Sequence, residues 1–207
     1  MTNDNTQPAS DNALNALTPL DGRYREQAKP LADYFSEAAL IRRRVFIELE
    51  WLKTLRPLLA PQVQVDDDAI DSIADAVKPQ SVKDTEQQTR HDLKAAEVCI
   101  ARQLQKNNLG DLLPLLHFAC TSWDINNLAQ TLMLRDAVVE VMLPQLEVVT
   151  AALDGAAKQY AALPMLSRTH GQPASPTTVG KEFANFAARL DGRARQIRAA
   201  VAKLPGK

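Results

Sequence analysis

The stretch INNLAQTLMLRDAVVEVMLPQLEVVTAALDGAAKQY, residues 125–160, decides the fold class of this chain. Apolar residues recur in it at steps of three and four, the spacing of one helix face, and Arg135 alone interrupts them. These apolar residues are Ile125, Leu128, Leu132, Val139, Met142, Leu146, Val149, Leu153, Ala156 and Tyr160. At 1.5 Å per residue such a helix is about 50 Å long, and Pro144 is the expected position of a kink.

A second helix of the same kind is expected after a break. Its apolar positions are Val179, Phe183, Phe186, Leu190, Ile197 and Ala200. A connection of about 16 residues, longer than a plain antiparallel turn requires, joins the two helices and contains SRTHGQPASP, residues 167–176. Two such helices cannot bury their apolar seams alone. The plain interpretation is a coiled-coil bundle or an adaptor scaffold without chemistry.

Upstream, the sequence predicts shorter helices. One begins near Ser36, and others cover about residues 69–77, before Pro79, and about residues 93–106, whereas the polar stretch DTEQQTRHD between them has no clear pattern. Residues 1–16 offer little to bury and are expected to form a disordered tail. The prediction is a mainly α chain, with an N-terminal helical domain at 17–112 and the first part of a central helical-bundle domain at 113–207.

Composition limits the classes of partner and compartment. The 207 residues carry 24 Lys and Arg against 25 Asp and Glu, so a net charge of -1 gives no reason to expect nucleic acid or a membrane surface as partner. Two cysteines, Cys99 and Cys120, form no metal-ligand spacing. The N-terminus has no basic and apolar signal pattern, and no apolar run of about 18 residues follows. A cytoplasmic location is expected.

The three histidines are the candidate chemical groups. His117 has apolar neighbours and is interpreted as a buried, hydrogen-bonded structural residue. His91, beside Asp92, is either part of a charged helix start or a binding residue, and His170 is either part of a turn or of an active site. No metal-binding, phosphate-loop or nucleophile-elbow motif accompanies them. The chemistry that remains possible is acid–base catalysis by histidine, without a cofactor or metal. Arginines, hydroxyl groups and helix starts would then hold the anionic groups of a substrate.

Several blocks of sequence carry a family resemblance. They are LTPLDGRY, FSEAALIRRRVFIELEWL, RHDLKAAE, HFACTSWDINN, LMLRDAV and LPMLSRTHGQPASPTTVGKE, and they run from about residue 17 onward. In these blocks the chain resembles the N-terminal part of the adenylosuccinate lyase family, in the fumarase/aspartase superfamily of mainly helical lyases. The resemblance implies a β-elimination that releases fumarate from adenylosuccinate, giving AMP, and from the succinyl-aminoimidazole-carboxamide ribonucleotide of purine synthesis.

The resemblance also implies roles for individual residues. It places His170 as the general acid that protonates the departing nitrogen. The residues that it assigns to substrate binding are Arg23, Tyr24, Arg90, His91, Asp92, Thr121 and Ser122. The first two would hold the phosphate, the next three would contact the substrate, and the last two would bind a succinyl carboxylate. Hydroxyl groups at a helix start suit that last role independently of the resemblance.

Family members form homotetramers, and the resemblance implies the same for the complete protein. Because a long helix separates Thr121 and Ser122 from His170, a site that uses all three has to be shared between subunits. The loop that supplies the base serine is expected beyond Lys207, so the chain is expected to be truncated and inactive alone. A non-catalytic scaffold and another fumarate-releasing lyase, of the argininosuccinate type, stay open as alternatives.

Overall fold

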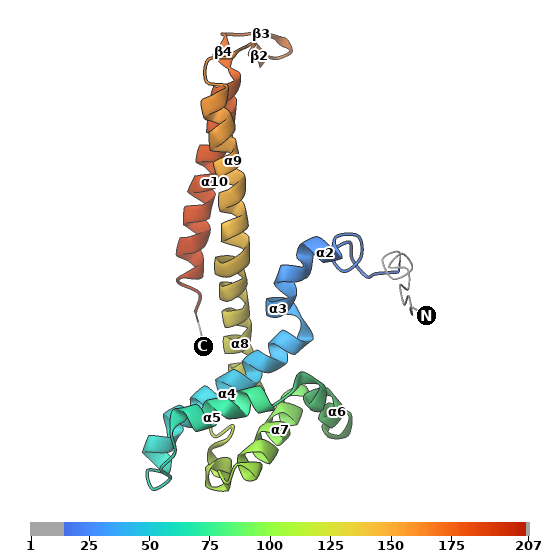
Figure 1. Cartoon of the computed structure of the whole chain (residues 1–207), viewed down its shortest axis with the longest axis vertical. Coiled ribbons are helices and arrows are strands. Elements are labelled where there is room, and N and C mark those ends of the chain that lie inside the picture. The colour runs from blue at the N-terminus through green and yellow to red at the C-terminus, as the bar shows by residue number, and fades with distance from the viewer. Residues whose placement is uncertain (1–14, 206–207) are drawn as a thin grey trace, which may run out of the picture. The chain divides into compact units, whose positions relative to one another are not determined.

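The computed structural model describes residues 15–205, and these residues form two compact units, one up to Met133 and one from Leu134 onward (Figure 1). The expected tail at 1–16 lies almost wholly outside the described residues. The described part of the chain is mainly helical, which confirms the predicted fold class. None of its helices is long and apolar enough to cross a membrane.

The first unit is built around one long helix. Its elements are α2 (Arg25–Ala28), the 3-10 turn η1 (Lys29–Leu31), α3 (Ala32–Phe35), α4 (Glu37–Leu59), α5 (Asp67–Ala76), α6 (Pro79–Thr89), α7 (Asp92–Lys106), the 3-10 turn η2 (Gly110–Leu115) and α8 (Ser122–Ala137), which continues past the boundary of the unit. Helix α4 contacts α5, α6, α7 and η2. Fully buried Leu49, Leu52, Ile70, Leu93 and Ile100 lie in the core that these contacts enclose.

Helix α4 begins where the sequence predicts. Ser36 precedes it in an extended conformation, and its Oγ accepts the Ala39 N–H at 3.2 Å, a cap that satisfies one of the free amides of the first turn. The apolar stripe of the helix is buried as expected, but two charged residues, Arg44 and Glu48, lie on the same buried face. The apolar pattern alone gave no reason to expect charges there.

Helix α6 was not expected. The polar stretch before His91, in which the sequence shows no clear pattern, is helical from Pro79 to Thr89. Pro79 stands at the start of the helix, where a proline has no amide to lose. Within the helix Val82 and Thr85 are buried, which is too few apolar contacts to produce a visible period. The helix ends at Arg90, whose φ of 52° is left-handed.

In the second unit, the end of α8 is followed by a π turn and then by helix α9 (Leu143–Gln159). The π turn, η3, covers Val138–Met142, and in it the Leu143 N–H bonds the Val138 carbonyl five residues back. Proline has no amide to donate to an α-helical ladder, and this wider turn directly precedes Pro144. The extra residue rotates the apolar stripe, so Val138 and Leu143 are buried while the expected Val139 and Met142 are exposed.

Helix α10 (Val179–Val201) runs antiparallel to α9 and packs along it (Figure 1). The connection between them holds two short antiparallel ladders, one inside the other. In the outer ladder β1 (Pro164–Met165) pairs with β4 (Thr177–Thr178), and in the inner one β2 (Arg168–Thr169) pairs with β3 (Gln172–Pro173). The two residues between β2 and β3 have φ of 50° and 78°, the positive values of a tight hairpin turn. They are His170 and Gly171, so the predicted acid stands at the tip of a hairpin.

Candidate functional site

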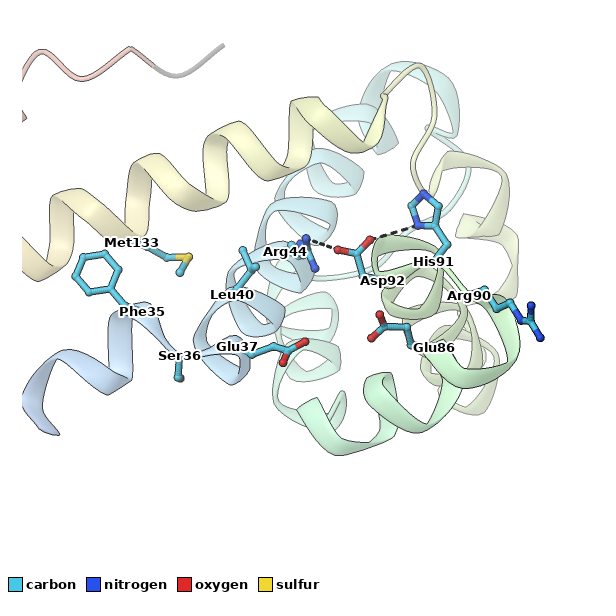
Figure 2. A pocket seen from close by; sticks show the side chains of 10 residues that line it. All are labelled: Phe35, Ser36, Glu37, Leu40, Arg44, Glu86, Arg90, His91, Asp92 and Met133. Carbon is cyan, nitrogen blue, oxygen red and sulfur yellow. Dashed lines mark hydrogen bonds and ion pairs between the residues drawn. The ribbon is translucent and has the colours of Figure 1, made fainter. Parts of the chain in front are cut away.

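A hollow of about 560 Å³ opens in the first unit beside the start of helix α7 (Figure 2). Ten residues line it: Phe35, Ser36, Glu37, Leu40, Arg44, Glu86, Arg90, His91, Asp92 and Met133. Three of the residues assigned to substrate binding, the consecutive Arg90, His91 and Asp92, are among them. Figure 2 shows the Arg90 side chain directed away from Asp92, so its guanidinium is not tied to that carboxylate.

His91 is the cap of helix α7. Its Nδ1 accepts the Lys94 N–H at 3.2 Å and lies 3.5 Å from Oδ1 of Asp92. The side chain is about half exposed. The two interpretations of His91, a helix start and a binding residue, are thus compatible, because the capping bond uses Nδ1 alone and the residue still lines the hollow.

Asp92 is held by both of its carboxylate oxygens. Oδ1 accepts the Leu93 N–H at 2.8 Å, and Oδ2 accepts from Nη2 of Arg44 at 2.6 Å. Partial burial opposes ionisation, but the Leu93 amide and the Arg44 charge outweigh it, so the pKa of Asp92 lies below its ordinary value. Asp92 is therefore a fixed, charged acceptor at the start of a helix.

Arg44 is the residue at this site that sequence reasoning missed. Only 7% of it is exposed, and besides Asp92 it contacts Asn126, with its Nε 2.7 Å from the amide oxygen. The sequence does contain a sign of this residue, because Arg44 is a charged residue within the apolar stripe of α4. Val45 and Leu49 of the same stripe are buried. A buried arginine needs partners, so its position already implied an acidic or amide group nearby.

Thr121 and Ser122 stand at the start of helix α8, as the sequence predicts. The N–H and the Oγ1 hydroxyl of Thr121 both donate to Oδ2 of Asp124, at 2.9 and 3.0 Å. Thr121 is exposed and Ser122 is half-buried. Neither residue lines the hollow of Figure 2.

The loop before α8 is tied to helix α4 at two points. Nδ1 of His117 lies 2.6 Å from Oε1 of Glu48, which is fully buried, and the Trp51 Nε1–H donates to the Phe118 carbonyl at 2.8 Å. Burial raises the pKa of the Glu48 carboxyl, and nearby Glu97 adds to the rise, although the bond and charge of His117 act in the opposite direction. The hydrogen bond predicted for His117 is present, but the residue is half-buried and not fully buried, with 18% of its side chain exposed.

The other predicted residues lie in exposed turns. Arg23 and Tyr24 precede helix α2, and the guanidinium carbon of Arg23 lies 5.4 Å from the centre of the Tyr24 ring. His170 is exposed at the tip of the inner hairpin and belongs to the second unit. Among the described residues, no group of three or more His, Cys, Asp or Glu side chains is placed to hold a metal ion.

The chain matches known proteins along most of its length. A family model described as "Lyase" covers residues 22–205. Adenylosuccinate lyases of Legionella pneumophila (strain Corby) and Escherichia coli (strain K12) are 41% and 39% identical to it over 194 residues, which are 89% of this chain and 42% of theirs. This chain thus spans less than half the length of these relatives.

Solved structures agree in fold. A fumarate lyase from Mesorhizobium sp. BNC1 superposes with a TM-score of 0.66 at 23% identity, over 84% of this chain and 40% of that one. At this identity the likeness shows the fold alone. The family model, however, covers most of the sequence, and we conclude that the chain belongs to this lyase family.

Proposed function

We propose that this chain is part of an adenylosuccinate lyase, which eliminates fumarate from adenylosuccinate to give AMP and acts likewise on the succinyl-aminoimidazole-carboxamide ribonucleotide. The observation that carries the proposal is the 41% identity to an adenylosuccinate lyase over 89% of the chain. The match covers 42% of that relative, so the lyase activity and the two substrates are proposed for the complete enzyme.

The reaction requires a base that removes a proton next to a carboxylate and an acid that protonates the departing nitrogen. We propose His170 as the acid. Its ring is exposed at the hairpin tip, and an imidazole exchanges protons near neutral pH. A turn with two positive φ angles presents the ring outward, and histidine tolerates that backbone conformation better than most residues.

The substrate carries a phosphate and two carboxylates, so most binding groups have to be cationic or hydrogen-bond donors. Arg23 and Tyr24 are proposed to hold the phosphate. Thr121 and the Ser122 hydroxyl are proposed to bind a succinyl carboxylate. The Thr121 hydroxyl donates to Asp124, so it has to turn away from that partner to contribute. Arg90, His91 and Asp92 contact the remainder of the substrate. An ionised Asp92 is suited to accept hydrogen bonds from the ribose hydroxyls, not to face the phosphate.

We further propose that the complete enzyme is a homotetramer whose sites combine residues of different subunits, and that residues from 113 onward belong to its central bundle. Exposed apolar side chains on the second unit support this proposal. Those on η3, α9 and α10 with at least 39% exposure are Val139, Met142, Val148, Val149, Phe186 and Ile197. Apolar rows of this kind on long helices are typical of surfaces that pack against further helices.

We also propose that the 207-residue chain alone has little or no lyase activity, since it spans 42% of the length of its relatives. Adenylosuccinate cleavage by the purified chain, followed by absorbance, tests this directly. Ordinary turnover by the chain would contradict it. A non-catalytic scaffold differs in ligand binding, because it should show no thermal shift with AMP or adenylosuccinate.

A complementation experiment tests both the acid and the shared site. A chimera supplies the missing length from the Escherichia coli relative, and its His170→Asn and Thr121→Ala variants are each expected to be inactive. Asparagine is chosen because it tolerates the left-handed turn but lacks the imidazole. Mixed tetramers of the two variants should regain part of the activity, since some sites contain neither substitution. Full activity of His170→Asn would remove the residue from the mechanism, and failure in a verified mixed tetramer would argue for sites within one subunit.

A further inference from the structure

One buried side chain joins the two helix starts that carry most of the proposed binding residues of the first unit. Arg44 of helix α4 contacts Asp92, the first residue of α7, through Nη2, and Asn126 of α8 through Nε. The ion pair with Asp92 is drawn in Figure 2. His91 directly precedes the first contact, and Ser122 lies one turn before the second. A single guanidinium therefore ties both helix starts to one helix.

We propose that Arg44 is a positioning residue that fixes the starts of α7 and α8 so that their binding groups hold the substrate. The inference rests on the proposed function, because the two helix starts matter only if they bind substrate. It gives a role to a residue that acts through Asp92 and Asn126 and does not itself react.

The geometry requires an arginine and not merely a positive charge. A guanidinium presents donors along several edges of one plane, so it reaches two acceptors in different directions, whereas a lysine offers one compact head group. Arg44 is 7% exposed, while the side chain of Asp92 is 45% exposed toward the hollow. The buried partner thus holds the accessible one in place. With Oδ1 on the Leu93 amide and Oδ2 on Arg44, the Asp92 carboxylate has a defined orientation.

A second contact on the same face of α4 supports this role for the helix. Glu48 lies one turn after Arg44 and holds His117 in the loop that leads to Thr121 and Ser122. The His117 backbone has a φ of 56°, which the Glu48 contact helps to maintain. The start of α7 and the loop that leads to α8 are therefore both held by side chains from adjacent turns of α4.

The competing explanation is that Arg44 only stabilises the fold and has no effect on substrate binding. The chain offers a matched control for this explanation. Arg56, on the same helix, is also partly shielded and bridges to the start of another helix. Its Nη1 donates to the Val65 carbonyl at 2.7 Å and its Nη2 to Asp67 at 3.1 Å. Arg56 does not line the hollow. Arg56→Met should lower stability without affecting the binding residues. Arg44→Met should lower stability and also disturb the binding residues.

The experiment compares Arg44→Met, Arg44→Lys and Arg56→Met in the 207-residue chain. Carbon-detected NMR follows the titration of the Asp92 carboxyl, and calorimetry gives the Kd of adenylosuccinate. For Arg44→Met, the Asp92 titration should move to higher pH, and the Kd should rise by about 10- to 100-fold, the loss that is typical of metal sites when a residue that orients a metal ligand is replaced. Arg44→Lys should shift the titration less but still weaken binding. Neither quantity should change in Arg56→Met.

An additional variant covers the case in which Arg44→Met does not fold. Asn126→Ala removes only the contact to α8, and it should weaken adenylosuccinate binding while leaving the Asp92 titration in place. Equal effects of the Arg44 and Arg56 variants on both quantities would overturn the proposal. If the unsubstituted chain binds no adenylosuccinate, the groups of this chain do not hold the substrate without the rest of the site. The Asp92 titration then decides alone whether Arg44 positions that carboxylate.

Discussion

Replacing Gly180 with alanine tests how closely the two long helices of the second unit approach. Gly180 is near the start of α10, and its N–H donates to the Tyr160 carbonyl at 2.9 Å. A Cβ atom at this position would lie 2.4 Å from the Ala157 carbonyl oxygen and 2.6 Å from backbone atoms of Ala161. Non-bonded heavy atoms prefer about 3.5–4.0 Å, so the backbones have to separate by about 1 Å.

The magnitude follows from two opposing effects. Overpacking of this kind costs about 1–3 kcal/mol, while alanine in a helix is favoured over glycine by about 0.5–1 kcal/mol. Gly180→Ala should therefore lower the free energy of unfolding by up to about 2.5 kcal/mol. Gly192, on the same helix, is a matched control, because the nearest atom to its Cβ would be Arg195 Nη2 at 3.9 Å. Gly192→Ala should raise stability by about 0.5–1 kcal/mol.

Hydrogen-exchange mass spectrometry of peptides from residues 134–205, at one protein concentration, reports this unit separately from the first. The difference between the two variants removes most of the intrinsic preference for alanine and leaves the overpacking cost. If Gly180→Ala and Gly192→Ala agree within about 0.5 kcal/mol, the reasoning from close helix approach is refuted.

Three further substitutions have definite expected results. Burial raises the pKa of Glu48 even though His117 acts in the opposite direction. The stability that protonated Glu48 contributes is therefore present at low pH and is lost as the pH rises through the folded-state pKa. The thermal midpoint of Glu48→Gln, measured across this pH range, should not show the loss. For Asp92 the pH dependence has the opposite sign, because partial burial is outweighed by the Leu93 amide and Arg44, which lower its pKa. The stability that ionised Asp92 contributes is lost as the pH falls through the lowered pKa. In Asp92→Asn the thermal midpoint should therefore fall less steeply on the acid side of its pH dependence. Ser36→Ala removes the cap of α4 and should cost about 1 kcal/mol in urea unfolding.

Helices with a strong apolar period were predictable from sequence. The helix that begins at Ser36, and those near residues 69–77 and 93–106, are found within a few residues of their expected bounds. Helix α6 was missed because it buries little beyond Val82 and Thr85, so its evidence lies in Pro79 at its start and not in a period. The π turn at 138–142 was missed because a constant helical period assumes that no residue is inserted.

The candidate site was predictable in part. The histidine and hydroxyl motifs are local in sequence, and the structure places Arg90, His91 and Asp92 around one hollow. Arg44 was not predicted, because its partner Asp92 is 48 residues away and only folding brings the two together. A charge on a buried helix stripe is nevertheless visible in sequence, and it marks a position where a distant polar partner should be sought.

The two nested ladders between α9 and α10 hold the hairpin tip in place. The outer ladder anchors the connection to the helices, and the inner ladder pairs β2 with β3 on either side of the turn that contains His170. Between them the chain is joined by the hydrogen bond from the Ala174 N–H to the Ser167 carbonyl, at 2.8 Å. This bond extends the inner pairing by one residue on each side, so residues 167–174 form one continuous hairpin. Weakening any part of this hairpin should therefore displace His170 from a substrate without changing the ring itself.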